Sequence, residues 1–453
     1  MKKRMYKIMA LAMTAAMVVP MAAQTTAFAA DDKEITYWNI AVESPDKDIV
    51  TAAVDKFNKE TKSGYTVNSV AIQNDTYKEK LVIAMSSGEC PDMYSSWSGG
   101  PMYEYIDSGF AQPIDDLLDQ SDVKDKLLDA AIEQGSYNGH VYAIPYLNVS
   151  LAGIFYNKDM FKQYGLEEPK TLADLENICA TLKENGITPF ALANASKWTG
   201  SMYFMSLAAR YGGLEPFQNA VAGTGKFTDD CFIKAGEKIQ EWVNNGYFPD
   251  GVNSLSEDDG QAKQLMYQET AGMLLCGSWY TGTFQTDSEE FYQKIGWFPF
   301  PAIDDSDADP TIQIGTVGDQ FISFNCEGDK LAAAFECATD HLSDEVEDMI
   351  YSTGKIAPVK DAGDHISDPV VKEIFDAAQK ASSIQLWYDQ YLPTSVASAH
   401  LDGLQEVFGL TKTPQEAQEE MQTAMDEYLS TKSDSGAADD TAEEATDDAA
   451  ADD

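Results

Sequence analysis

Strand-like and helix-like segments alternate from the start of this chain, and that alternation limits its fold more than any other feature. Residues 35–38 (ITYW) have the composition of a strand, and a helical pattern of apolar residues follows Pro45. The pair repeats as a strand-like run at 67–72 and a helical pattern at 75–86, and a third strand-like run follows at 90–94. Strands that alternate with helices indicate an α/β fold, in which helices cover both faces of a mostly parallel sheet.

A proline marks the point at which the chain is expected to leave this first sheet. A strand-like run from Val141 ends at Pro145, and a second apolar run follows and ends at Tyr156. Because proline has no N–H to donate, it is not expected inside a central strand. We therefore expect the chain to cross near residues 148–149 into a second lobe.

The rest of the chain has the length and periodicity that a second lobe requires. Helices are expected at 171–185, 198–211 and 228–245, with a buried strand at 273–276. A strand near 319–324 and an amphipathic helix near 329–342 follow. A mature chain of about four hundred residues is long enough for two domains or one large two-lobed unit.

The first 29 residues have the pattern of a secretory signal peptide. A basic start (Lys2, Lys3, Arg4 and Lys7) is followed by an apolar stretch and by Ala27-Phe28-Ala29, an A-x-A cleavage motif. We expect a secreted protein, beginning near Ala30, that works at the extracellular face of the cell membrane or in a periplasm. The leader contains no cysteine, so a lipid-attachment cysteine is not expected there.

The chain is strongly acidic. Its formal net charge is −44, and loss of the four basic leader residues makes it −48. This charge repels phosphate backbones, so nucleic acid is not an expected partner. Residues 432–453 hold part of the charge, lack large apolar side chains and are expected to be a disordered tail. That tail is either a solvating spacer or an inert terminus.

The cysteines and histidines do not follow a metal-binding pattern. The sequence has six cysteines without any C-x-x-C pair, and its four histidines are far apart. We therefore expect no metal site and no cofactor. The acidic run at 304–309 is similar in composition to a calcium loop, but Pro310 stands where that loop needs glycine. Three disulfides are possible in principle, yet a chain of this length does not need them, so buried thiols are the favoured interpretation.

The common catalytic motifs are missing from the sequence. It has no G-x-S-x-G, H-E-x-x-H or G-x-x-x-x-G-K-[ST] segment. A glycosidase needs two suitably spaced carboxylates, but a chain with 75 Asp and Glu residues supplies candidate pairs almost anywhere. We expect a binding protein rather than an enzyme, and a secreted glycan-active hydrolase is the alternative.

Four tryptophans lie in segments that we predict to be loops: Trp97, Trp198, Trp279 and Trp387. Sugar rings present flat C–H faces surrounded by hydroxyls, so a site for them combines aromatic planes with fixed carboxylates and amides. Trp97 and Trp279 each follow a strand-like run and have small neighbours that let a ligand approach the backbone. The alternative for each tryptophan is a place in the hydrophobic core.

Three short motifs in the middle of the chain resemble a known family. They are Ala143-Ile-Pro145, Tyr156-Asn-Lys-Asp159 and Gly165-Leu-x-x-Pro-x-Thr171. In this order the chain resembles the solute-binding subunits of carbohydrate ABC importers, the maltose-binding-protein-like family 1 extracellular solute-binding proteins. The resemblance implies two α/β lobes, each with a mostly parallel sheet, joined by a multi-strand hinge. The N-terminal lobe would comprise 30–147 with about 302–345, and the C-terminal lobe 148–301 with about 346–431.

The resemblance also implies a ligand and the residues that bind it. A monomeric protein would close over an oligosaccharide and deliver it to the membrane permease of an ABC importer. The expected ligand-binding residues are Asn39, Glu43, Asn74, Asp75, Trp97, Trp198, Trp279, Asp319, Trp387 and Tyr388. For Asp319, capping of a strand end at a turn is an equally good interpretation. An importer subunit for a non-sugar solute, such as a peptide or a polyamine, is a second alternative.

Overall fold

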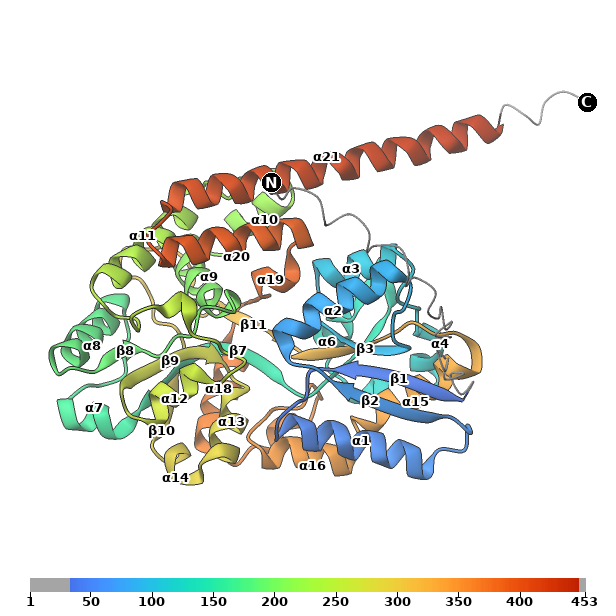
Figure 1. Cartoon of the computed structure of the whole chain (residues 1–453), viewed down its shortest axis with the longest axis horizontal. Helices are drawn as coiled ribbons and strands as arrows, with labels where there is room; N and C mark the ends of the chain where they lie inside the picture. Colours follow the sequence, from blue (N-terminus) through green and yellow to red (C-terminus); the bar gives the residue numbers. More distant parts are fainter. Residues whose placement is uncertain (1–32, 448–453) are drawn as a thin grey trace, which may run out of the picture.

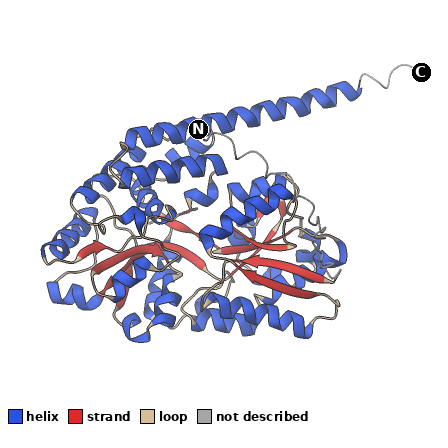
Figure 2. Ribbon diagram, in the orientation of Figure 1, coloured by secondary structure: helices blue, strands red, loops and turns tan. Residues whose placement is uncertain are grey.

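The computed structural model describes residues 33–447, with side chains through Lys432. The predicted signal peptide, residues 1–29, lies outside the described residues. Two separate sheets, each flanked by helices, form two lobes that lie side by side (Figures 1 and 2). The predicted two-lobed α/β fold is confirmed.

The first lobe contains a five-stranded sheet with the strand order β2-β1-β3-β12-β6. Its strands are β1 (Glu34–Asn39), β2 (Thr66–Ala71), β3 (Met93–Ser96), β6 (Ala143–Tyr146) and β12 (Gln320–Phe324). Its helices are α1 (Asp46–Glu60), α2 (Asn74–Ser87), α3 (Gly100–Asp107), α4 (Asp115–Asp119), α5 (Val123–Lys126), α6 (Asp129–Gln134), α15 (Gly328–Asp340) and α16 (Asp344–Ser352). A short hairpin of β4 (Ser136–Tyr137) and β5 (His140–Val141) precedes β6. As predicted from the alternation, β1 pairs in parallel with both β2 and β3.

The second lobe contains a six-stranded sheet built around one long central strand, β7 (Val149–Asn157). The other strands are β8 (Thr188–Phe190), β9 (Ala271–Gly277), β10 (Ile295–Phe298), β11 (Gln313–Val317) and β13 (Ile384–Gln385). The strand β7 is antiparallel to all three of its neighbours, β9, β10 and β11. Only the outer pairs β8–β9 and β11–β13 are parallel, so this sheet is more mixed than the alternation pattern indicated. The difference arises because β7 enters the sheet directly from the other lobe rather than through a crossover helix.

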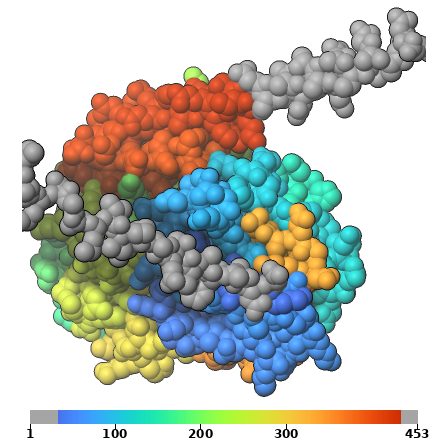
Figure 3. All heavy atoms as spheres, turned by 45° about the vertical axis from the view of Figure 1, so that its right-hand side comes forward, coloured from blue at the N-terminus to red at the C-terminus, as the bar shows by residue number. Residues whose placement is uncertain are grey.

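Helices surround this second sheet on both faces (Figure 1). They are α7 (Lys158–Tyr164), α8 (Leu172–Glu184), α9 (Trp198–Gly212), α10 (Glu215–Val221), α11 (Asp230–Asn244), the short 3-10 helix Val252–Ser254, α12 (Gln261–Tyr267), α13 (Tyr280–Asp287), α14 (Glu289–Tyr292), α17 (Ala362–His365), α18 (Pro369–Lys380), α19 (Tyr388–Tyr391), α20 (Thr394–Phe408) and α21 (Pro414–Asp447). Figure 3 shows the red surface of the last helices lying against the light-blue surface of the first lobe.

The three motifs in the middle of the chain begin and end local elements. Pro145 lies in β6, which is at one edge of its sheet. An edge strand has a neighbour on one side only, so it tolerates a residue without an N–H better than a central strand does. The Asn157 side chain caps α7 by accepting the N–H groups of Asp159 and Met160. Gly165 ends α7 in the left-handed conformation, and Thr171 forms a capping box at the start of α8.

The chain crosses between the lobes three times, and Asn148 ties these crossings together. Its side chain accepts the Ile356 N–H at 2.8 Å and donates to Ser150 Oγ at 3.2 Å. Its backbone carbonyl accepts the Asp319 N–H at 2.6 Å. The side chain and backbone of one buried residue thus link the first, second and third crossing segments, which form the hinge between the lobes.

The second crossing falls later than the sequence indicated. We expected the chain to return to the first lobe near residue 302, but β11 at 313–317 still belongs to the second sheet. The return occurs at Gly318 and Asp319, directly before β12. Helix α16 then packs against α1, so the first-lobe segment extends to the third crossing near 355–356.

A buried arginine fastens the long connection between β10 and β11. Arg210 of α9 is 3% exposed and donates to the backbone carbonyls of Phe300, Pro301 and Ile312 at 2.8 to 3.3 Å. Burial lowers the pKa of this guanidinium to about 10, so it stays charged at neutral pH. Arg210 therefore fixes both ends of the acidic segment at 302–311 onto the lobe core.

The six cysteines are free thiols in the structure, and five of them are buried. Burial raises the pKa of Cys231 to about 11 and those of Cys90 and Cys326 to about 12. These thiols are protonated at neutral pH, as the favoured interpretation of the sequence required.

The C-terminal helix corrects part of the predicted disorder. We expected residues 432–453 to be disordered, but the backbone of α21 is helical through Asp447 (Figure 1). Alanine and glutamate favour helices and this segment contains no proline, which explains the continuation. Throughout the described part of the chain, none of the helices is long and apolar enough to cross a membrane.

Candidate functional site

A cavity of about 510 Å³ lies between the two lobes. The first lobe lines it with the loops that follow β1, β2 and β3, which are the carboxyl ends of its parallel strands. The second lobe lines it with the start of α9, the segment before α12, the loop after β9 and the loop after β13. Residues from both lobes and from the hinge thus face one space, whose volume is typical of small-ligand sites.

Three tryptophans of the second lobe form one aromatic cluster in this cavity. The ring centroids of Trp198 and Trp279 are 6.0 Å apart with an interplanar angle of 59°. Trp279 and Trp387 are 5.9 Å apart in an edge-to-face arrangement. All three line the cavity, and the buried Trp198 Nε1 has no hydrogen-bond partner among residues 33–432. The cluster therefore offers aromatic surface to the cavity.

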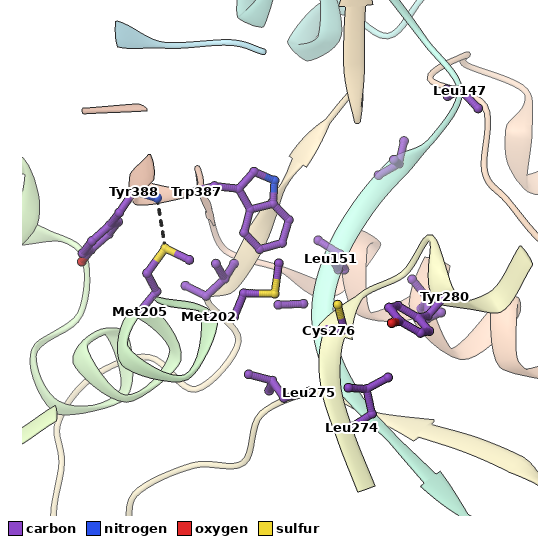
Figure 4. Close-up of a cluster of buried hydrophobic side chains, with 14 of the residues drawn as sticks. Leu147, Leu151, Met202, Met205, Leu274, Leu275, Cys276, Tyr280, Trp387 and Tyr388 are labelled. Carbon is purple, nitrogen blue, oxygen red and sulfur yellow. Dashed lines mark hydrogen bonds between the residues drawn. The ribbon is translucent and has the colours of Figure 1, made fainter. Parts of the chain in front are cut away.

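Local backbone geometry holds each of these indoles in place. Lys197 has φ 63° and ψ −47°, and Trp198 N–H bonds to Ser196 O at 2.7 Å, a γ-turn of the strained type. The Trp279 indole packs directly against the backbone of Gly277. A Cβ at position 277 would lie 1.9 Å from the indole ring, so only glycine leaves room for it. Figure 4 shows Trp387 beside Met202 and Met205 of α9, which support its inner side.

Trp97 is the aromatic residue that the first lobe contributes. It follows β3, lines the cavity and is partly exposed. Its ring meets Tyr77 edge-to-face at 5.9 Å, and Lys78 Nζ lies 5.0 Å from its centroid. Tyr77 is itself fixed because its hydroxyl donates to Ser95 O at 2.6 Å. The edge of Trp97 is thus held by α2, and the indole faces the cavity.

The polar residues predicted for the site have different positions. Glu43 and Asn74 line the cavity, with Glu43 at the exposed rim. Asp75 does not line it, but its backbone N–H donates across the lobes to Asp258 Oδ2 at 3.1 Å. Asp319 lines the cavity at the hinge. Burial raises the pKa of its carboxyl to about 7, although the positive charge of nearby Lys355 acts to lower it.

Besides Asp75, two more residues on the predicted list lie outside the cavity. Asn39 is 1% exposed; it donates to Ser69 Oγ at 2.8 Å and accepts the Ala41 N–H at 3.0 Å, so it shapes the loop after β1. Tyr388 stacks on Phe217 with centroids 4.2 Å apart, inside the second-lobe core. Neither side chain is placed to touch a ligand in the cavity.

The sequence reasoning missed the acidic segment before α12. Glu257, Asp258 and Asp259 all line the cavity. Tyr280 donates its hydroxyl to Glu257, and burial raises the pKa of that carboxylic acid to about 7. The only signal in the sequence was three consecutive acids before a glycine, which is common in so acidic a chain.

Direct contacts between the lobes surround the cavity. Lys78 of α2 pairs with Asp389 of α19 at 3.3 Å, and Glu43 lies 3.7 Å from Lys263 of α12. Further from the cavity, Glu104 of α3 accepts both the N–H (3.0 Å) and the hydroxyl (2.6 Å) of Thr394 at the start of α20. The two lobes are therefore in direct contact, both beside the cavity and further from it.

At Gly99 and Gly100 the backbone of the first lobe lies very close to the backbone of the second lobe. A Cβ on Gly99 would lie 2.3 Å from Gln390 O, and one on Gly100 would lie 2.2 Å from Leu392 O. Both carbonyl oxygens belong to the backbone of the segment that follows Trp387. Within residues 33–432, no group of three or more His, Cys, Asp or Glu side chains is placed to hold a metal ion.

Comparisons with known proteins agree with this two-lobed architecture. A solved structure from work on xylan utilization by Caldanaerobius polysaccharolyticus superposes with a TM-score of 0.79 at 29% identity. The superposition covers 86% of this chain and 99% of the other chain. An uncharacterized ABC transporter extracellular-binding protein of Pyrococcus horikoshii is 29% identical over 288 residues, 62% of this chain and 64% of that relative. A multiple sugar-binding protein of Streptococcus mutans is 30% identical over 178 residues, 36% of this chain and 39% of that relative.

The chain thus spans less than two thirds of the length of either of these two curated relatives. The model of one family, described as bacterial extracellular solute-binding protein, matches residues 41–338, which is well over half of the chain. Proteins of this family are solute receptors and not enzymes, which agrees with the expectation of a binding protein. The chain belongs to the bacterial extracellular solute-binding protein family.

Proposed function

We propose that this protein captures an oligosaccharide in the cavity between its lobes and delivers it to the membrane permease of an ABC importer. The observation that carries the proposal is the aromatic arrangement. Trp279 of the second lobe contacts both Trp198 and Trp387, and the three indoles share one cavity with Trp97 of the first lobe. Such surfaces match the flat C–H faces of sugar rings.

The polar lining supplies the second half of sugar recognition. Glu257 and Asp319 are partly buried carboxylates at the cavity wall, and Asn74 and Gln390 add amides. Hydroxyl groups donate to carboxylates and exchange bonds with amides, so these residues fit the rims of sugar rings. Several separate indoles favour an oligosaccharide over a single sugar.

The relatives support the same ligand class. One is named a multiple sugar-binding protein, and the similar solved structure comes from a study of xylan utilization. For this chain the proposal also includes export by the signal peptide at 1–29, action outside the cell membrane as a monomer, and an acidic C-terminal spacer.

Ligand binding drives lobe closure in this proposal. A ligand shifts an equilibrium between open and closed states only if it binds one state better. An oligosaccharide that touches Trp97 and Trp279 together does so, because these residues lie on opposite lobes. The closed form is then the one that the permease recognises.

An importer subunit for a polyamine is the second candidate, and the acidity of the cavity favours it. The acidic residues that line the cavity outnumber its lysines: Glu43, Asp46, Glu257, Asp258, Asp259, Asp319 and Asp389 against Lys78, Lys263 and Lys355. The indole cluster, which a thin and flexible polyamine would leave largely uncovered, favours the sugar.

Titration calorimetry with neutral oligosaccharides and with spermidine tests the proposal. Trp279→Ala should weaken oligosaccharide binding by about 2 kcal/mol, because the ring surface that covers the sugar is lost. Tyr65→Ala removes an aromatic ring outside the cavity and should leave the affinity unchanged. Equal affinities of wild type and Trp279→Ala, or binding of spermidine alone, would contradict the proposal.

A further inference from the structure

Each lysine that lines the cavity already has a carboxylate partner from this chain. Lys78 pairs with Asp389 at 3.3 Å. Lys263 pairs with Asp287 at 2.9 Å and lies 3.7 Å from Glu43. Lys355, whose side chain is 2% exposed, pairs with Asp46. No arginine lines the cavity, so among the described residues its wall offers no cation without an internal partner.

Within the described part of the chain, four carboxylates at the wall have no ion pair: Glu257, Asp258, Asp259 and Asp319. Glu257 and Asp319 are the two with the largest change in pKa. Glu257 accepts a hydrogen bond from the Tyr280 hydroxyl, and its charged surroundings are Asp258, Asp75 and Lys263. Asp319 faces the Lys355–Asp46 pair and has no ion-pair partner within 4.0 Å. Burial removes water from both carboxyl groups and raises the pKa of each to about 7.

We propose that the cavity admits uncharged glycans and rejects glycans that carry carboxylate or sulfate groups, with Glu257 and Asp319 as the residues that set this preference. The inference rests on the proposed function, since it names the class of oligosaccharide that the same site takes.

Electrostatics explains the direction of the preference. An anionic group on the ligand would lose its water when the lobes close, and it would meet carboxylates rather than a free cation. Recruiting one of the lysines would strand Asp46, Asp287 or Asp389 without its partner, and the side chain of Asp389 is only 8% exposed. Uncharged hydroxyls carry no such cost, because they donate to the same carboxylates.

Calorimetry with matched neutral and anionic probes tests the inference. The neutral probes are xylotetraose, cellotetraose and tetra-N-acetylchitotetraose; the anionic probes are xylotetraose with one glucuronic acid branch and tetragalacturonic acid. At pH 7.5 we expect at least one neutral probe to bind, and each anionic probe to bind at least 10-fold more weakly than the best neutral one. An anionic probe that binds as tightly as the best neutral probe would overturn the inference while supporting a glycan receptor. Failure of all five probes to bind would overturn the proposed function, and this inference with it.

Isosteric variants then test the two named residues. Glu257→Gln keeps an acceptor for Tyr280 and removes the charge, so the neutral-to-anionic affinity ratio should fall by about 10-fold. Asp319→Asn provides the same test at the hinge if the first variant does not fold. Asp305→Asn removes one exposed charge outside the cavity and should leave the ratio unchanged. Ratios equal to that of wild type in both folded cavity variants would show that Glu257 and Asp319 do not set the preference.

Discussion

The contact between Gly100 and Leu392 predicts that one methyl group will hold the lobes apart. Gly100 is the first residue of α3 in the first lobe, and Leu392 follows α19 in the second lobe. A Cβ on Gly100 would lie 2.2 Å from Leu392 O, whereas ordinary contacts begin near 3.4 Å. The atoms in the way are backbone atoms, so no side chain can rotate to make room. Gly100→Ala therefore requires the two segments to separate by about 1 Å if they are to coexist.

The energetic cost of this separation can be worked out from the packing. Overpacking by one methyl group typically costs 1–3 kcal/mol. If the contact belongs to the ligand-bound state, a cost of about 2 kcal/mol falls on the closed form only, and the affinity for the glycan should drop roughly 30-fold. The open protein should keep its fold, because each lobe has a separate sheet and its own packed helices.

Titration calorimetry and thermal unfolding together test this prediction. Gly109→Ala is the matched control at the other end of α3: nothing lies within 4 Å of its Cβ position, but its φ of +78° makes alanine unfavourable. The control should lower the melting temperature without changing the affinity. Gly100→Ala with native affinity and a native unfolding curve would refute the idea that this contact forms on closure.

Three more predictions follow from buried groups. Arg210→Met leaves three buried carbonyls without a donor, so denaturant titration should show a loss of about 3 to 5 kcal/mol in unfolding free energy; a loss below 1 kcal/mol would contradict the role of Arg210. Asn148→Ala removes the acceptor of the Ile356 N–H, and chemical unfolding should show a cost of about 2 kcal/mol. Since the pKa of Glu257 rises from 4.5 unfolded to about 7 folded, its stabilising effect is present below pH 4.5 and is lost as the pH rises through 7. As the pH is lowered from 8 to 5, the unfolding free energy of wild type should therefore rise relative to that of Glu257→Gln. A difference that stays constant over this range would show that Glu257 does not titrate with a raised pKa in the folded protein.

Local signals in the sequence predicted the elements of the fold well. The position of Pro145 predicted that this run would not be a central strand and that a crossing would follow, because the missing N–H has the same consequence in any sheet. Asn157 and Thr171 cap their helices through contacts with residues two or three positions away, and such contacts are readable from spacing alone. Features that depend on neighbours in sequence were thus accessible before the structure.

Features that depend on distant neighbours were not accessible. The pairing of β11 with β7 placed the second crossing after residue 317, and nothing in composition marks that point. Tyr388 and Trp387 are adjacent, yet the turn into α19 sends one ring onto Phe217 and the other to the cavity wall. In the sequence, nothing distinguishes Glu257 from the rest of the 75 acidic residues. Only the structure shows that it is buried at the cavity wall with a raised pKa.

The hydrogen bonds around Ser278 give a physical reason why binding and hinge movement are coupled in the proposed mechanism. Ser278 precedes Trp279, accepts from the Asn148 side chain at 3.4 Å and donates to Val149 O at 3.2 Å. Thr281, two residues after Trp279, donates to Gly354 O at 2.5 Å, directly before the third crossing. The loop that carries the central indole is therefore bonded to two of the three hinge segments. In the proposed mechanism, a sugar that shifts Trp279 also shifts the hinge segments about which the lobes rotate. If the loop lost its hydrogen bond to Asn148, we would expect sugar binding without closure of the lobes.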